Sequence, residues 1–338
     1  MNIEVWHVTG AAFHFGQHGL GQEETGVHWP SDSLWAAILS RMVEQVGEAS
    51  MTQLAEALKS GAPPLALSSV FPRAAAVLFF PRPMRLPHAV DEPHGLRPKD
   101  VKKVKWLSER LFRAVLEGQS LASVLAGAEY WHDGAVALTR EEREPFPANF
   151  KIWAIEKRPR VAVGRTDNAS QIYHTGRATF ASKAGLWFAA RWRDESWRPA
   201  IETALADLAV TGLGGNRSVG FGACQIEKRG ALTLPEPADG LWVSLSRYLP
   251  RSDEMRAFEH SQAAYAVEHV GGWVYSPTDK NQRRRTVRLL AEGAVLGYAG
   301  RAMPGDTVDV QPDYNGNQPL GHAVWRSGLA LAVGLKET

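Results

Sequence analysis

A glycine-rich segment between residues 212 and 222 carries the residue types of this 338-residue chain that most directly suggest ligand binding. Glycine tolerates positive φ angles and lets the backbone approach a ligand, so successive N–H groups can point at one phosphate. No Gly-Lys-Ser/Thr follows, so the segment is not a nucleotide P-loop. A purely structural loop is the alternative, and the positive charge of Arg217 favours phosphate binding. The expected binding residues are Gly212, Gly214, Gly215, Asn216, Arg217, Ser218, Gly220 and Phe221.

A polar turn, GRTDNAS, separates two strand-like stretches at 151–163 and 171–180. This pattern is typical of a projecting β-hairpin. Guanidinium, hydroxyl and amide donors beside an aromatic ring suit the phosphates and unpaired bases of single-stranded RNA. A lone hairpin of this kind is more often only a turn. The candidate RNA contacts here are Arg165, Thr166, Asn168, Ser170 and Tyr173.

Residues that could support catalysis or hold a metal are scattered. His14, His18 and His28 lie in or near an earlier glycine-rich stretch, with no cysteine or carboxylate at metal-ligand spacing. The single cysteine, Cys224, excludes an internal disulfide framework, and its place in an expected strand suggests a small core residue. We therefore expect no catalytic residue, no metal and no cofactor.

Composition places the chain among globular proteins that work in a reducing compartment. Hydrophobic residues make up 44% and charged residues 22%, which allows a packed core, and the length favours two domains. No signal peptide and no apolar run of membrane-spanning length is present, so we expect a cytoplasmic protein without a membrane partner. The net charge is only +2, but basic residues gather at 97–113, 157–165 and 280–288. Such runs could converge on a polyanion, although any single run is more often a solvated surface.

Hydrophobic periodicity predicts an α+β fold. Apolar residues recur at helical spacing from Ser31, the expected N-cap, to Val46. The order of expected elements is the β-α-β-β-α-β pattern of a ferredoxin-like domain with an elaborated middle. After residue 236 the chain becomes strand-rich and nearly helix-free. The other expected elements are strands at 3–9, 70–80, 185–192 and 223–229 and helices at 99–117 and 196–209.

Several segments resemble one known family. GLGGNRSVGFGAC resembles the glycine-rich loop of the RAMP superfamily of CRISPR proteins. An ordered set of segments over essentially the whole chain resembles the 5′-tag-binding subunit of type III-A (Csm) complexes. These segments are FHFGQHGLG, HWPSDSLWAAIL, FFPRPMRLP, LRPKDVKKVKWLSERLF, VAVGRTDNASQIYH, WVSLSRYLP and GGWVYSP.

The resemblance implies two ferredoxin-like (RRM-like) domains. The first would span 1–235, with a helical insertion at about 81–150 and a β-hairpin thumb at about 161–180. The second, 236–338, would be strand-rich and degenerate. The insertion is expected to be an appendage on the sheet domain with a basic outer surface.

The resemblance also implies a role. The subunit would hold the 5′ tag of CRISPR RNA, dock the large cyclase-bearing (polymerase-like) subunit, abut the first RAMP backbone subunit and cap the filament, with target RNA near the thumb. The glycine-rich loop would grip tag phosphates, with Asn216 where family members often have lysine, and His14 and Ser31 are further expected RNA contacts.

The residue types alone leave two alternatives to an RNA-binding scaffold. One is a metal-independent RAMP endoribonuclease that processes precursor CRISPR RNA, with His14 or His18 as general base. Subunits of the resembled kind are not regarded as nucleases, which argues against it. The other is a structural linker that makes no RNA contact.

Overall fold

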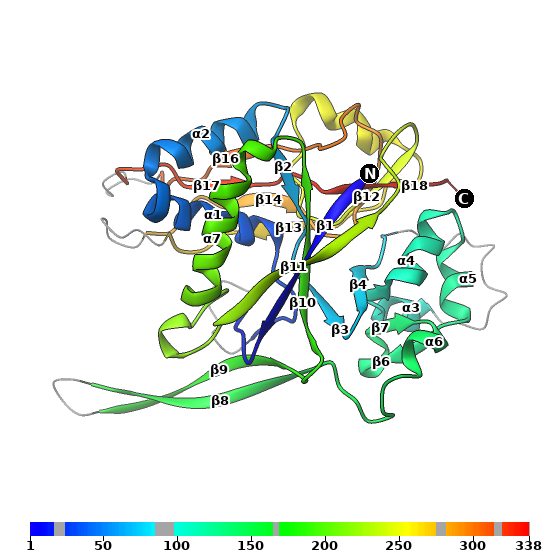
Figure 1. The fold of residues 1–338 in the computed structure, drawn as a ribbon, viewed down its shortest axis with the longest axis horizontal. Helices are drawn as coiled ribbons and strands as arrows, with labels where there is room; N and C mark the ends of the chain where they lie inside the picture. The colour runs from blue at the N-terminus through cyan, green and yellow to red at the C-terminus, as the bar shows by residue number, and fades with distance from the viewer. Residues whose placement is uncertain (17–23, 85–97, 165–168, 275–281, 314–319, 338) are drawn as a thin grey trace.

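The computed structural model describes residues 1–16, 24–84, 98–164, 169–274, 282–313 and 320–337. It is a mixed α+β structure built around one large sheet (Figure 1). The strands of this sheet lie in the order β11-β1-β10-β3-β4-β5-β7-β6, and β2 also pairs with β10. Their bounds are β1 Asn2–Gly10, β2 Leu65–Leu67, β3 Phe71–Ala74, β4 Val77–Pro81, β5 Trp106–Ser108, β6 Glu129–Trp131, β7 Val136–Leu138, β10 Ala184–Trp192 and β11 Cys224–Thr233.

The centre of the sheet is antiparallel. β1 pairs with β10 on one side and β11 on the other, and β2 and β3 follow one another along the far edge of β10. A β-α-β-β-α-β chain produces this strand order when its two helices cover one face. The helices are α1 Ser31–Val46 and α7 Arg198–Thr211, joined on that face by α2 Glu48–Lys59.

Alternation along β1 explains the two faces of the sheet. Trp6 and Val8 pack with α1 and α7, whereas Ile3 and Val5 pack against the opposite core. The ladder to β11 shifts register between Val5 and Trp6, where Arg229 is the extra residue on β11.

The predicted insertion is part of the sheet rather than an appendage. β5 pairs with β4, and β7 runs parallel to β5, so the sheet continues through this region. The expected helix at 99–117 is wrong, since β5 interrupts it: sheet pairing outweighs the helical spacing of its apolar residues. Short helices flank these strands, namely α3 Pro98–Lys103, α4 Glu109–Leu116, α5 Leu121–Ala126 and α6 Arg140–Arg143.

Two further expectations about local structure need correction. The single strand expected at 70–80 is a tight hairpin, in which Ala75 takes a left-handed φ of 48° between β3 and β4. Ser31 does not cap α1: Pro30 holds the N-cap position and makes no side-chain cap. The expected strand 3–9 and the helix beginning at Ser31 are confirmed.

The C-terminal region is strand-rich, with one 3-10 helix at Ser252–Glu259. Its central sheet has the order β15-β12-β18, and two short hairpins, β13–β14 and β16–β17, complete it. We see no second β-α-β-β-α-β arrangement within the described residues, so a degenerate ferredoxin-like origin stays a prediction. The bounds are β12 Leu241–Ser244, β13 Val267–Val270, β14 Val287–Leu290, β15 Val295–Gly297, β16 Thr307–Asp309, β17 Trp325–Ser327 and β18 Ala332–Leu335.

Among the described residues, no helix combines the length and apolar character needed to span a bilayer.

Candidate nucleic-acid interface

The glycine-rich loop joins the end of α7 to the start of β11, and close backbone approaches fix its shape. At Gly214, where φ is +85°, a Cβ atom would lie 2.5 Å from the carbonyl oxygen of His14. At Gly222, where φ is +88°, it would lie 2.3 Å from the carbonyl oxygen of Leu213. Side chains are excluded at both positions, so part of the glycine content is structural.

Three consecutive amides in the middle of the loop are available to a ligand. Most other N–H groups of the loop donate to carbonyl oxygens of the loop or of residues 12–14. Within the described residues, the N–H groups of Asn216, Arg217 and Ser218 donate to no acceptor. They lie at the start of the 3-10 turn Arg217–Val219, where Asn216 has a left-handed φ of 57°. Successive free N–H groups in such a turn form a concavity that attracts anions.

The side chains of this turn add donors to the concavity. Arg217 and Ser218 are exposed, and Arg217 forms no ion pair with any carboxylate of the described chain. The Nδ2 atom of Asn216 is buried without an acceptor. A phosphate placed here would meet a positive charge, a hydroxyl and three amides.

A long hairpin projects beside this loop (Figure 1). It consists of β8 Trp153–Val163 and β9 Ser170–Phe180, so it begins earlier than the expected thumb range 161–180. Most of its outer part is exposed, including Ser170, Tyr173, Lys157 and Arg158. The tip residues Arg165, Thr166 and Asn168 lie outside the described part of the chain.

His14 joins the loop to the base of the hairpin. Its Nδ1 atom lies 2.8 Å from the carbonyl oxygen of Gly176 on β9, and its own carbonyl oxygen accepts the N–H of Gly215 at 2.9 Å. Because a carbonyl oxygen only accepts, Nδ1 carries the proton. Next to it, Phe13 and Ala178 exchange two backbone hydrogen bonds of 2.8 and 2.9 Å.

A second contact joins the two elements. The guanidinium of Arg160 on β8 lies 5.5 Å from the ring centroid of Phe221, a buried residue at the end of the loop. This distance is within the range of a cation–π interaction. The loop and the hairpin base therefore form one continuous surface.

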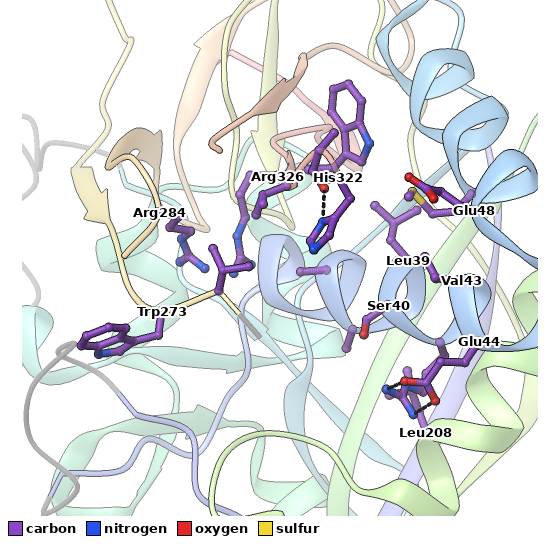
Figure 2. Close-up of a pocket in the computed structure, with 18 of the residues that line it drawn as sticks. Leu39, Ser40, Val43, Glu44, Glu48, Leu208, Trp273, Arg284, His322 and Arg326 are labelled. Atoms are coloured by element: carbon purple, nitrogen blue, oxygen red, sulfur yellow. Dashed lines mark hydrogen bonds and ion pairs between the residues drawn. The ribbon is translucent and has the colours of Figure 1, made fainter. Parts of the chain in front are cut away.

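A groove of about 360 Å³ continues from the loop between α1 and the C-terminal region. Gly212, Gly214 and Arg217 belong to its lining. Figure 2 shows Trp273 and Arg284 on one side of it and Ser40 and Glu44 of α1 on the other, with His322 and Arg326 nearby. Trp273 is 58% exposed, so an aromatic surface and several cations adjoin the turn at 216–218.

An ion cluster fixes the groove on its C-terminal side. The carboxylate of Asp32, fully buried near the start of α1, lies 3.5 Å from Nη1 of Arg247 and 3.4 Å from Nη1 of Arg326. Burial raises the pKa of Asp32 above its usual value, and the two arginines oppose this shift. The cluster ties the helical face of the sheet to the C-terminal region.

Comparison with known proteins agrees with the family suggested by the sequence. Residues 238–335 match the family described as CRISPR Csm4 C-terminal domain. A protein of Methanocaldococcus jannaschii named "CRISPR system Cms protein Csm4" is 22% identical over 95% of this chain and 94% of its own length. A protein of the same name from Thermococcus onnurineus is 22% identical over 90% of this chain and 91% of its own length.

The chain is similar to Csm4 proteins over nearly its whole length, and residues 238–335 match the Csm4 family. The resemblance to this family in the sequence is thereby confirmed. Solved Csm4 structures share the fold: a chain in "Csm3-Csm4 subcomplex in the type III-A CRISPR-Cas interference complex" has a TM-score of 0.66 at 17% identity over 99% of this chain and 100% of its own. A chain in "Csm1-Csm4 cassette in complex with pppApA" has a TM-score of 0.57 at 16% identity. The match covers 100% of this chain and 99% of that one.

The structure brings together only some of the residues that the sequence predicts as RNA contacts. The glycine-rich loop, Phe221 and His14 come together at the hairpin base. Ser31 lies apart, 1% exposed: its N–H donates to Ser69, and its hydroxyl accepts the N–H of Arg247 at 2.9 Å. An RNA contact by Ser31 stays a prediction that this geometry does not support.

Sequence reasoning missed the groove. Its cations come from α1, from 284 and from 322–326, which are far apart in the chain, so no local pattern marked them. The basic run at 280–288 was the available signal. Arg284 lines the groove, whereas Arg285 donates to the carbonyl oxygen of Asp309 at 2.8 Å.

The structure offers little for catalysis at this interface. His14 is 6% exposed and holds Gly176, while His18 lies outside the described residues. Burial raises the pKa of the Cys224 thiol to about 12, which disfavours the nucleophilic thiolate. Within the described residues, no group of three or more potential ligand side chains could hold a metal.

Proposed function

We propose that this Csm4-family chain is a non-catalytic subunit of a type III-A CRISPR interference complex that holds the 5′ tag of CRISPR RNA. The observation that carries the proposal is the turn at 216–218, where three unpaired N–H groups lie beside the exposed Arg217. One tag phosphate would bind there. A neighbouring unpaired base would stack on the aromatic surface of the groove, next to Trp273.

The hairpin is proposed to act on the duplex between guide and target RNA. Its base is fixed to the phosphate-binding loop through His14 and Phe13, so it extends from the point where the tag would end. Its exposed apolar residues, Val161, Val163 and Ile172, could lie against a base pair and wedge it open.

The partners follow from the solved relatives. Csm4 proteins have been solved in a subcomplex with Csm3 and in a cassette with Csm1. By analogy, we propose that this chain contacts a backbone subunit and the large subunit, and thereby caps one end of the filament.

Binding to labelled CRISPR RNA with and without its 5′ tag tests the proposal. The purified chain, alone and together with its partner subunits, is measured at two salt concentrations, and the RNA is then inspected on a denaturing gel. We expect tag-dependent, salt-sensitive binding and intact RNA. Cleaved RNA would indicate the endoribonuclease, and equal affinity for tagged and untagged RNA would reject the tag-holding role.

A further inference from the structure

A second pocket lies on the other face of the sheet, opposite α1 and α7. It has a volume of about 590 Å³ and opens where β1 ends and where β10 and β11 begin. Phe180, the last residue of the hairpin, is part of its lining, as is Ala223, which follows the glycine-rich loop. The polar residues that line it are Thr9, Arg73, Ser182, Lys183, Cys224 and Gln225.

Arg73 is a buried cation in this pocket without a carboxylate partner. Its side chain is on β3 and the residue is only 9% exposed. The guanidinium donates to Thr9 Oγ1 at 2.7 Å, to the carbonyl oxygen of Leu186 at 3.2 Å and to that of Ala75 at 3.4 Å. All three acceptors are neutral, and no carboxylate of the described chain lies within ion-pair distance. Buried charges are normally paired, because leaving water costs them several kcal/mol.

The backbone makes room for this arrangement. A Cβ atom at Gly185, which pairs with Arg73 across β3 and β10, would lie 3.2 Å from Nη2 of Arg73 and 2.7 Å from the carbonyl oxygen of Val8. The glycine lets the guanidinium lie over β10 and reach Thr9. Burial lowers the pKa of Arg73 and the charge of Arg229 lowers it further, while the more distant carboxylate of Glu227 opposes this shift without reaching ion-pair distance.

Lys183 brings a second cation to the pocket. It is exposed in the turn between β9 and β10, with a left-handed φ of 67°. Within the described residues it forms no ion pair, and no acidic residue belongs to the pocket lining. Ser182 and Gln225, both exposed, add neutral donors.

We propose that this pocket binds a phosphate group of the RNA strand, in addition to the phosphate at the glycine-rich loop. Arg73 would supply a positive charge held in place by its hydrogen bonds, and Lys183 a positive charge on a flexible side chain. Ser182 and Gln225 would donate hydrogen bonds to the phosphate. The choice of RNA as the source of the phosphate rests on the proposed function, because the pocket adjoins both the hairpin base and the end of the loop. A carboxylate of a protein partner is the competing occupant.

The variant Lys183→Glu tests the proposal, since it places a carboxylate beside Arg73 and should leave the fold intact. Lys102→Glu, at an exposed lysine of α3, is the matched control for charge. Tagged RNA is titrated with the assembled complex at several salt concentrations. We expect Lys183→Glu to weaken binding about tenfold and to reduce the salt slope by about 0.7 or more, as for one lost phosphate on a single strand, while Lys102→Glu changes neither.

A second readout does not depend on RNA. Inorganic phosphate should raise the melting temperature of the unmodified chain more than that of Lys183→Glu. Unchanged RNA affinity in Lys183→Glu would overturn the proposal, and loss of a protein subunit with unchanged RNA affinity would identify a partner carboxylate instead. If Arg217→Ala weakens the binding of tagged RNA and Lys183→Glu does not, the second phosphate site is rejected and the proposed function stands. If tagged RNA does not bind the unmodified complex, the proposed function itself is rejected.

Discussion

The Nδ1 atom of His14 lies 2.8 Å from the carbonyl oxygen of Gly176, and this hydrogen bond connects the glycine-rich loop to the projecting hairpin. His14 touches both elements, since its own carbonyl oxygen accepts the N–H of Gly215. The buried imidazole thus holds the hairpin base in place relative to the turn at 216–218.

His14→Ala should loosen the hairpin base. The carbonyl of Gly176 would lose its donor, which costs about 1–3 kcal/mol when the group stays buried. We expect faster amide hydrogen exchange at the hairpin base and weaker binding of tagged RNA. His14→Asn, whose side-chain amide can donate from a similar place, should restore much of the protection. Equal exchange in all three proteins would show that the bond does not hold the hairpin.

Comparing Gly214→Ala with Gly220→Ala separates the cost of a steric clash in the glycine-rich loop from the cost of backbone strain. Both residues have positive φ, which costs alanine about 1–2 kcal/mol. Only at Gly214 would the added Cβ lie 2.5 Å from a backbone oxygen, whereas at Gly220 it would meet nothing within 4 Å. Denaturant unfolding should therefore show a larger loss of stability for Gly214→Ala. Similar losses at both positions would contradict the observed loop geometry.

Asp32→Ala should be strongly destabilising. It would leave Arg247 and Arg326 as buried cations without their carboxylate, and breaking a buried pair in this way costs about 3–5 kcal/mol. The exposed Asp239 provides a control, since Asp239→Ala should change the free energy of unfolding by less than about 0.5 kcal/mol. A small effect of Asp32→Ala would show that the cluster does not tie the two regions together.

Glu4 makes stability depend on pH in the acid range. Burial alone would raise its pKa, but hydrogen bonds from Arg198, Lys228 and Trp192 outweigh burial and lower the pKa to about 2. A carboxyl with a lowered pKa stabilises the fold above its unfolded pKa, and this stabilisation is lost as the pH falls from about 4.5 towards 2.

Glu4→Gln measures this contribution. At pH 7 the variant should be less stable by about 1–2 kcal/mol after allowance for solvent screening. The difference should shrink as the pH falls through that window. A difference that stays constant from pH 7 to pH 2.5 would contradict the lowered pKa.

The sequence predicted elements with an uninterrupted pattern and missed those set by pairing with distant strands. The helix starting at Ser31 has a complete apolar stripe and is correct. The run from 70 to 80 lacks a glycine, asparagine or aspartate that would mark its turn, so the hairpin at Ala75 could not be seen. The helix Glu48–Lys59 was overlooked although Met51, Leu54 and Leu58 have helical spacing.

The candidate site was predictable only where its residues are contiguous. The glycine-rich loop is one segment, so its residue types revealed it. Trp273, Arg284 and Arg326 meet only in the folded chain. Arg73 stands out because it is buried without an ion-pair partner among the described residues, which is a property of tertiary structure. Ser31, which the family resemblance suggested as an RNA contact, is buried against the C-terminal region.

The most direct test of the proposed tag binding at residues 216–218 compares Arg217→Ala with Arg193→Ala. Both arginines are exposed and form no ion pair within the described chain, but Arg193 follows the far end of β10. Affinity of the assembled complex for tagged RNA is measured across a salt series. Arg217→Ala should weaken binding about tenfold and reduce the salt slope by about 0.7, and Arg193→Ala should match the unmodified protein. Equal affinity and slope for all three proteins would contradict phosphate binding at residues 216–218.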